Sequence, residues 1–293
     1  MFPPCVTYFE AAIDMLWSIV SVAMTLAASL LYQPSGYENA ALGGPAVVRA
    51  LFQRTPGVAD LVTSLRSGDP RERVAAACQL QQLGSDARSA IPALVERLAD
   101  GSPVDPMACG KDRSFWSKDV EREVTPGEEA AAALVAIGTE SLPSLVTASR
   151  APQWVARRNA VWALGALDDA RGAAPVRVAL SDREPPVRRV AAWALGALQA
   201  SDAVPALIAA LKDSDAEVRS QVAWALGAIR DRRAVDGLID ALGDDAERVR
   251  SQAAWALGSL GDRRATDALA ALLKDPSARV RKQAAWALGS IGR

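Results

Sequence analysis

Hydrophobic positions in the C-terminal half of the chain follow two alternating helical patterns. The first pattern, in segment 203–213, places apolar side chains at i, i+3, i+4 and i+7: Val204, Leu207, Ile208 and Leu211. The second pattern, in segment 216–229, forms one apolar stripe with Leu226 at its edge: Val218, Val222, Ala225 and Ile229. Short turns rich in aspartate separate the patterns, so each unit is predicted to be a pair of helices.

These helix pairs recur with a constant period. A tryptophan, a glycine and a valine each return every 31 residues: Trp162, Trp193, Trp224, Trp255 and Trp286; Gly165, Gly196, Gly227, Gly258 and Gly289; Val187, Val218, Val249 and Val280. A fixed period of this size indicates stacked supersecondary units, in which each unit contacts only its neighbours. The pattern therefore predicts an all-α fold, a right-handed α-solenoid of about seven antiparallel helix pairs.

Weaker copies of the unit lie upstream. The segments 74–84 and 128–138 align Cys78 and Ala132 with the recurring tryptophan. Between them lies a polar loop insertion, residues 100–125, which contains two prolines, is followed by a third at Pro126, and interrupts the period. Insertions in solenoids usually form loops on one face. We predict that the array spans residues 56–293.

The recurring tryptophan does not belong to the apolar stripe of its helix. At ~100° per residue, Trp224 lies about 150° from the centre of that stripe. Its helical neighbours are Glu217, Ser220 and Gln221. A glycine inside a helix costs ~1 kcal/mol relative to alanine. Its return in each unit predicts the close approach of a neighbouring helix.

The motif V-R-x-x-A-A-W-A-L-G-x-L-G, complete at Val249–Gly261, resembles the short HEAT-like repeats first associated with phycobilisome bilin lyases. The resemblance covers residues 56–293. It implies a solenoid whose second helices line the concave side. HEAT repeats also resemble one another in an aspartate and an arginine six residues apart, and here a structural ladder is expected of Asp182 and Arg188, Asp213 and Arg219, Asp244 and Arg250, and Asp275 and Arg281.

The resemblance and the tryptophan pattern together predict a row of indoles on the second helices. The indoles either seal the groove between repeats or contact a ligand, and the two roles are compatible. Candidate partner-binding residues are Trp162, Trp193, Trp224, Trp255, Trp286, Arg158, Asn159, Arg189, Gln221, Gln252 and Gln283. The leading hypothesis is a non-enzymatic scaffold that binds a protein or an extended peptide.

The N-terminal 32 residues follow another pattern. Residues 15–32 contain no charged side chain. The segment has about the ~18-residue length of a membrane span. A membrane anchor, a cleaved signal peptide and a buried core helix all remain open. The leader before Met15 lacks the lysine or arginine typical of a signal peptide. We predict a hydrophobic helix in residues 1–32, a linker at 33–55 and a membrane-anchored or exported protein of a bacterial-type envelope.

The composition argues against most chemistry. The chain has no histidine, the commonest general base and metal ligand, so no catalytic, metal or cofactor site is predicted. Deoxyhypusine hydroxylase, which has a similar repeat pattern, holds its di-iron centre with histidine and glutamate pairs. This chain has no histidine, so none of those ligand positions can be matched. A net charge of −1 makes a nucleic-acid-binding solenoid an unlikely alternative. A bilin-lyase-like, enzyme-associated role is the other alternative.

Two further features have open interpretations. Cys78 and Cys109 form a disulfide if this part of the chain lies outside the cytoplasm, and otherwise are two inert thiols. At the C-terminal edge, the last second helix has no distinctive polar capping unit. Either this edge forms a homodimer, or Lys274, Arg279 and Lys282 make it polar enough.

Overall fold

The computed structural model describes residues 56–105 and 124–291. The chain divides into two units, Met1–Thr55 and Pro56–Arg293, and only the second is described. The predictions for the hydrophobic segment 1–32 and the linker 33–55 therefore lie outside the described residues.

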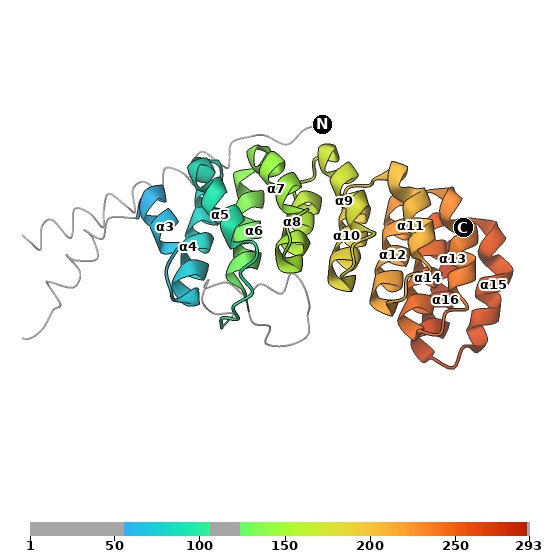
Figure 1. Ribbon diagram of the computed structural model, residues 1–293. Helices are drawn as coiled ribbons and strands as arrows, with labels where there is room; N and C mark the ends of the chain where they lie inside the picture. Colours follow the sequence, from blue (N-terminus) through green and yellow to red (C-terminus); the bar gives the residue numbers. More distant parts are fainter. Residues whose placement is uncertain (1–55, 106–123, 292–293) are drawn as a thin grey trace, which may run out of the picture. The chain divides into compact units, whose positions relative to one another are not determined.

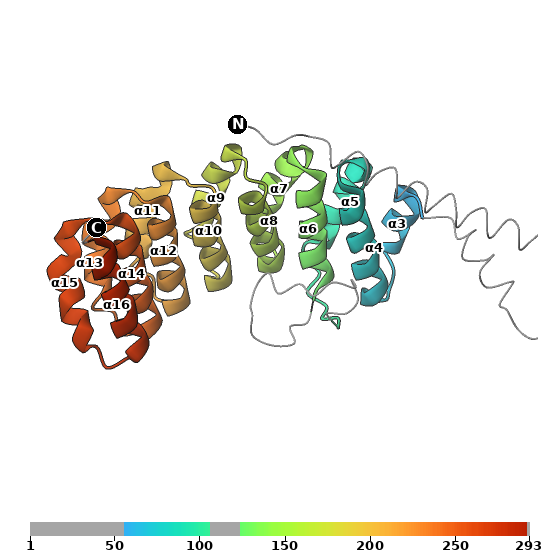
Figure 2. The same ribbon diagram turned by 180° about the vertical axis from the view of Figure 1, so that it is seen from behind.

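Seven helix pairs follow one another in the second unit, as Figures 1 and 2 show from opposite sides. The first helices of the pairs are α3 (Val58–Ser64), α5 (Ile91–Arg97), α7 (Leu142–Ala148), α9 (Ala173–Ala179), α11 (Val204–Ala210), α13 (Val235–Ala241) and α15 (Thr266–Ala271). The second helices, called B helices below, are α4 (Pro70–Leu83), α6 (Pro126–Ile137), α8 (Trp154–Ala166), α10 (Pro185–Ala197), α12 (Ala216–Ile229), α14 (Glu247–Leu260) and α16 (Ala278–Ile291). The predicted solenoid of helix pairs is confirmed.

The residues in the turns determine where each helix begins and ends. Asp215 begins α12 by accepting hydrogen bonds from the backbone N–H groups of Glu217 and Val218, as an N-cap residue does. The same helix ends at Arg230, whose φ is +58°. The equivalent residue after α14 is Gly261, with φ +65°, where glycine adopts the left-handed conformation without steric cost. Short 3₁₀ turns, such as η6 (Arg232–Ala234), lead into the next helix.

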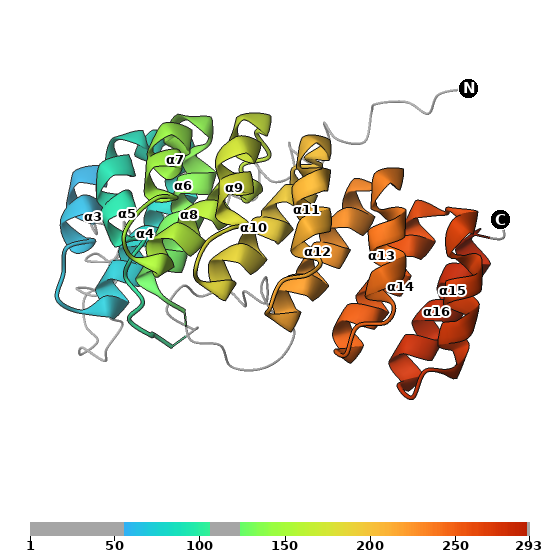
Figure 3. The same ribbon diagram turned by 45° about the vertical axis from the view of Figure 1, so that its right-hand side comes forward.

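The core is a continuous strip between the two helix layers. In α12, Val218, Val222 and Ala225 of the predicted stripe and Leu226 at its edge are fully inaccessible to solvent, whereas Ile229 is only partly buried. On the first helix, Leu207 is equally buried. Neighbouring B helices contact each other more extensively than neighbouring first helices do, and the layered stacking is visible in Figure 3. Close packing of the B layer places this layer on the inner side of the stack.

The glycine of the B helices allows this close packing. A Cβ atom added to Gly227 would lie 2.7 Å from Cα of Ala256 and 2.7 Å from Cζ3 of Trp255, both on α14. Real Cβ atoms do not approach other atoms so closely, and a side chain here would push the helices apart. The predicted reason for the mid-helix glycine is therefore confirmed.

The two ends of the insertion, outside residues 106–123, pair with each other. Val104 and Val124 form an antiparallel bridge through hydrogen bonds of 2.8 and 2.9 Å. The Val104 side chain packs on Val74 and Cys78 of α4. Val104 thus packs, at the first B helix, on Cys78, which aligns with the tryptophan of later repeats.

A search for membrane-spanning helices in the described ranges found no single helix that is long and apolar enough. One bent pair of helices, Pro126–Ile137 with Thr139–Ala148, is long and apolar enough only when its two parts are taken together.

Candidate interaction surface on the B helices

The five recurring tryptophans lie on the same side of successive B helices, from α8 to α16. We call this side, with its neighbouring side chains, the B face. Trp162, Trp193, Trp224 and Trp255 are partly buried and pack against the core. Trp286 is 45% exposed. The indoles are therefore neither core residues nor free surface side chains.

Four of the five indoles, from Trp193 onward, contact the preceding repeat. The Cζ3 atom of Trp224 approaches Gly196 of α10, and Trp286 approaches Gly258 of α14 in the same way. Trp162 and Trp193 also stack, with ring centroids 6.4 Å apart and planes inclined by 13°. The packing role that the sequence left open is thus present in the structure. It lies toward the preceding repeat, because from Trp193 onward each Cζ3 atom lies beside the glycine of the preceding B helix.

A second row of the B face is made of glutamines. Gln221, Gln252 and Gln283 each lie three residues before a tryptophan, and all are partly exposed. None of the three side chains forms a hydrogen bond within the described part of the chain. A side-chain amide has both donors and an acceptor, so this row can pair with the N–H and C=O groups of a bound backbone.

Asn159, expected to contact a partner, is instead buried, with 3% of its surface exposed. Its Nδ2 atom donates to the carbonyl oxygen of Leu98 at 2.9 Å. Asn159 therefore braces α8 against the preceding repeat. The expectation was wrong because the Asn159 side chain lies in the close contact between α8 and α6. Gly127 of α6 leaves room for it, since a Cβ on Gly127 would lie 2.8 Å from Nδ2 of Asn159.

Arg158 is held by the protein itself. Its guanidinium forms an ion pair of 3.0 Å with Glu128 and lies over the ring of Trp154, 5.6 Å from its centroid. Trp154 is 37% exposed. Sequence reasoning missed Trp154 because it lies outside the 31-residue series, although its position one turn before Arg158 on the same helix was a usable signal.

The charges on the rest of the B face are unequally neutralised. Arg248 pairs with Glu217 of the preceding repeat at 2.7 Å. In contrast, Arg189, Arg279 and Lys282 are exposed and take part in no ion pair or hydrogen bond through their side chains among the residues described. Basic groups are therefore in excess on this face.

The expected ladder of aspartates and arginines connects neighbouring repeats. Arg219 donates from Nε to Oδ2 of Asp244 at 2.7 Å and from Nη2 to Oδ1 at 2.8 Å. Its Nη1 donates to the backbone oxygen of Asp213, in the turn of its own repeat. Each arginine thus binds the aspartate of the following repeat: Arg157 to Asp182, Arg188 to Asp213, Arg219 to Asp244 and Arg250 to Asp275.

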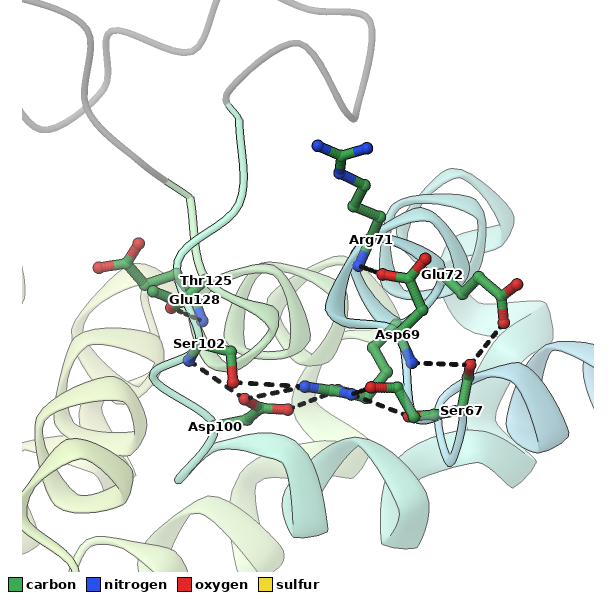
Figure 4. Close-up of polar contacts among 10 residues, drawn as sticks. Ser67, Asp69, Arg71, Glu72, Asp100, Ser102, Thr125 and Glu128 are labelled. Carbon is green, nitrogen blue, oxygen red and sulfur yellow. Dashed lines mark hydrogen bonds and ion pairs between the residues drawn. The ribbon is translucent and has the colours of Figure 1, made fainter.

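The first rung lies apart from the others. Arg73 binds Asp100 at 2.7 Å. Figure 4 shows Asp100 beside Ser102 in the turn that leads into the insertion. Arg73 and Arg157 were not predicted, because residues 67 and 151, six positions before them, are serine and alanine and not aspartate. At the rung between them, Gly127 occupies the position of the arginine. The bonds of Asn159 and Glu128 connect the repeats there instead.

The ladder carboxylates are ionised. The hydrogen bond from Arg219 lowers the pKa of Asp244, and that from Arg250 lowers the pKa of Asp275. Burial raises the pKa of Asp182, but the hydrogen bonds from Arg157 and from the Glu184 N–H outweigh it, so that pKa is also lowered. Each Oδ1 atom additionally accepts a backbone N–H, for example Ala246 on Asp244 at 2.9 Å. The ladder carboxylates therefore join neighbouring repeats as charged hydrogen-bond acceptors.

Cys78 is disulfide-bonded and only 6% exposed. Its Sγ atom lies 3.5 Å from Oε2 of Glu129. A disulfide sulfur carries no hydrogen, so this is a proximity contact rather than a hydrogen bond. Cys109, the predicted partner, lies outside the described residues, and the pairing of Cys78 with Cys109 stays a prediction.

Other sites for chemistry are few in the described ranges. No group of three acidic or cysteine side chains there is arranged to hold a metal ion. A shallow cleft of about 610 Å³ lies between α5, α7 and the start of α8. It is lined mainly by apolar residues, with Glu96 and Arg150 among them, and carries no arrangement of catalytic groups.

Models of two repeat families match the sequence. HEAT repeats match residues 173–250 and 235–293, and the PBS lyase HEAT-like repeat matches residues 72–100 and 156–182. No curated protein matches the chain.

Several solved structures are similar. The complex of CpcE and CpcF of phycocyanin lyase from Nostoc sp. PCC7120 matches 88% of this chain and 100% of that chain, with 21% identity and a TM-score of 0.44. Importin beta matches 80% of this chain and 37% of its own, with 16% identity and a TM-score of 0.54. A mutant of Kap121p matches 80% and 29%, with 15% identity and a TM-score of 0.60.

These similarities show the fold and not a shared activity. The present chain spans 37% and 29% of the two larger proteins, which are long helical solenoids. The matched repeats, their period and the stacked helix pairs show that the chain is a HEAT-repeat protein whose upstream repeats are of the PBS lyase HEAT-like kind.

Proposed function

We propose that the chain is a non-enzymatic scaffold that binds an extended segment of a protein along the concave B face. The glutamine row carries this proposal. Its three members, Gln221, Gln252 and Gln283, are partly exposed and form no side-chain hydrogen bonds in the described part of the chain. Amides that recur at a regular step without such bonds are available to a ligand. The sequence of residues 15–32 supports a location at or beyond a membrane.

The spacing of the repeats suits an extended ligand. Neighbouring packed helices lie ~8–10 Å apart, and an extended chain advances ~3.3 Å per residue. One repeat therefore corresponds to about three residues of the ligand. Glutamine amides one repeat apart would pair with its backbone, while the exposed edges of the indoles contact its side chains, as tryptophan does at binding hot spots.

Selection from a random peptide library tests this function. Peptides of about 12 residues, long enough to span four repeats when extended, are displayed and selected on the full chain. The affinity of a retained peptide is then compared between the wild type and a variant with Gln221→Ala, Gln252→Ala and Gln283→Ala. A protein hydrogen bond contributes ~0.5–1.5 kcal/mol, so three of them correspond to a loss of about tenfold or more.

The matched control is Gln82→Ala, an exposed glutamine of α4 outside the B-face row. The control should bind as the wild type does. Both variants should unfold at the wild-type temperature, because these glutamine side chains form no hydrogen bonds in the described part of the chain. Failure to enrich any peptide, or full affinity in the triple variant, contradicts the proposed function.

A further inference from the structure

The charges of the B face distinguish between classes of ligand. The acidic side chains Glu128 and Glu217 are neutralised by Arg158 and Arg248, through ion pairs of 3.0 and 2.7 Å. The cations Arg189, Arg279 and Lys282 have no such partner among the described residues. A ligand on this face therefore meets uncompensated positive charge at α10 and at α16.

The α16 end of the face has the larger excess. Within its first two turns, α16 carries Arg279, Arg281 and Lys282 and no acidic residue. The N-terminus of a helix has a partial positive charge of its own, so cations there are unfavourable and an anion is favoured. By contrast, α12 and α14 each have a glutamate in the first turn, Glu217 and Glu247.

Arg281 has the ladder position of α16 and does not lie on the B face, because it precedes Trp286 by five residues. Its Nη1 atom donates to the carbonyl oxygens of Asp275 and Pro276 at 2.7 and 2.9 Å, as the ladder arginines do in their own turns. In the four preceding repeats the Nε and Nη2 atoms of the equivalent arginine bind a carboxylate. In the described part of the chain, Nε and Nη2 of Arg281 bind none.

We infer that the ligand of the B face is an acidic segment, with one carboxylate on the cations of α16 and a second near Arg189 of α10. The inference rests on the proposed function, because it describes the ligand of the same face. Three repeat steps separate α10 from α16, so the two acidic positions lie about nine residues apart in an extended chain. Between them the ligand passes Gln221 and Gln252.

The same library provides the first test. Peptides retained on the wild type are expected to be enriched in aspartate and glutamate, with acidic residues near both ends. Enrichment of neutral or basic peptides would overturn the acidic ligand and leave the proposed function intact. No enrichment at all would contradict both, so the two failures are distinguishable.

A charge reversal provides the second test. A retained acidic peptide is measured against the wild type, against Arg279→Glu with Lys282→Glu, and against Arg177→Glu, an exposed arginine on α9 away from the B face. Affinity should fall about tenfold or more in the first variant and not in the second. On the wild type it should also fall as salt increases, because exposed charges are screened. Equal affinity for all three proteins, or no salt dependence, would overturn the inference.

Discussion

At the scale of single residues, the recurring tryptophan and glycine form one contact. From Trp193 onward, each indole packs against the glycine of the repeat before it, and a Cβ atom on Gly227 has no room between Ala256 and Trp255. Trp162, Trp193, Trp224 and Trp255 are partly buried and keep part of their surface accessible, and Trp286 is 45% exposed. The same residue thus fixes the spacing of the helices and presents an aromatic surface at that spacing.

Gly227→Ala tests this contact. The added methyl group should lower the free energy of unfolding by ~1–3 kcal/mol, as overpacking does. Gly289→Ala is the matched control, because a Cβ there has no neighbour within 4 Å and alanine is favoured in a helix by up to ~1 kcal/mol. Urea unfolding of both variants measures the difference. Equal stability of the two variants would show that the glycine is not needed for close approach.

The sequence predicted the side of the helix on which the indoles lie but not how far they are buried. A helical wheel placed Trp224 away from the apolar stripe, which is correct, yet the wheel of one helix contains no information on the neighbouring helix. Asn159 illustrates the same limit, since its burial depends on Gly127 and on the carbonyl of Leu98, 61 residues earlier. Such contacts follow from stacking and not from periodicity.

At the scale of secondary-structure elements, the ladder arginine links three segments: its own helix, its own turn and the following turn. The sequence identified the aspartates and arginines by their spacing of six residues, but it left open whether the pairs form within or between repeats. The structure shows side-chain pairing between repeats and backbone contacts within them. Only the stacking of complete helix pairs brings residues 25 positions apart together, so spacing alone could not decide.

A double-mutant cycle measures this link. Arg219→Ala and Asp244→Ala, singly and together, should give a coupling energy of ~1–3 kcal/mol, because the pair is partly buried and charged. The cycle of Arg248→Ala and Glu217→Ala is the control. That pair is 62% and 43% exposed, and its coupling should stay below ~1 kcal/mol. Similar couplings in both cycles would mean that the ladder contributes no more than a surface ion pair.

At the scale of the whole molecule, the ladder makes stability depend on pH. The folded-state pKa values of Asp100, Asp182, Asp213, Asp244 and Asp275 are all lowered. A carboxyl with a lowered pKa stabilises the fold when it is ionised, above its unfolded value of ~3.9. This stabilisation is lost as the pH falls through the folded pKa values, which lie below ~4.

We therefore expect the midpoint of thermal unfolding to change little above about pH 5 and to fall steeply below about pH 4. Asp244→Asn removes one of the titrating groups and should make the fall shallower, at the cost of lower stability near neutral pH. Thermal scans across this range by circular dichroism provide the measurement. A variant with the same acid slope as the wild type would show that Asp244 does not contribute through its charge.

The B face is the part of the whole molecule on which the proposed function depends, and its contact with a ligand is directly observable. The full chain is labelled with 5-fluorotryptophan, its ¹⁹F resonances are assigned by single tryptophan-to-phenylalanine variants, and a selected peptide is titrated in. The resonances of Trp224, Trp255 and Trp286 should shift with saturation. Binding that leaves all three resonances unmoved would place the ligand elsewhere and contradict the account.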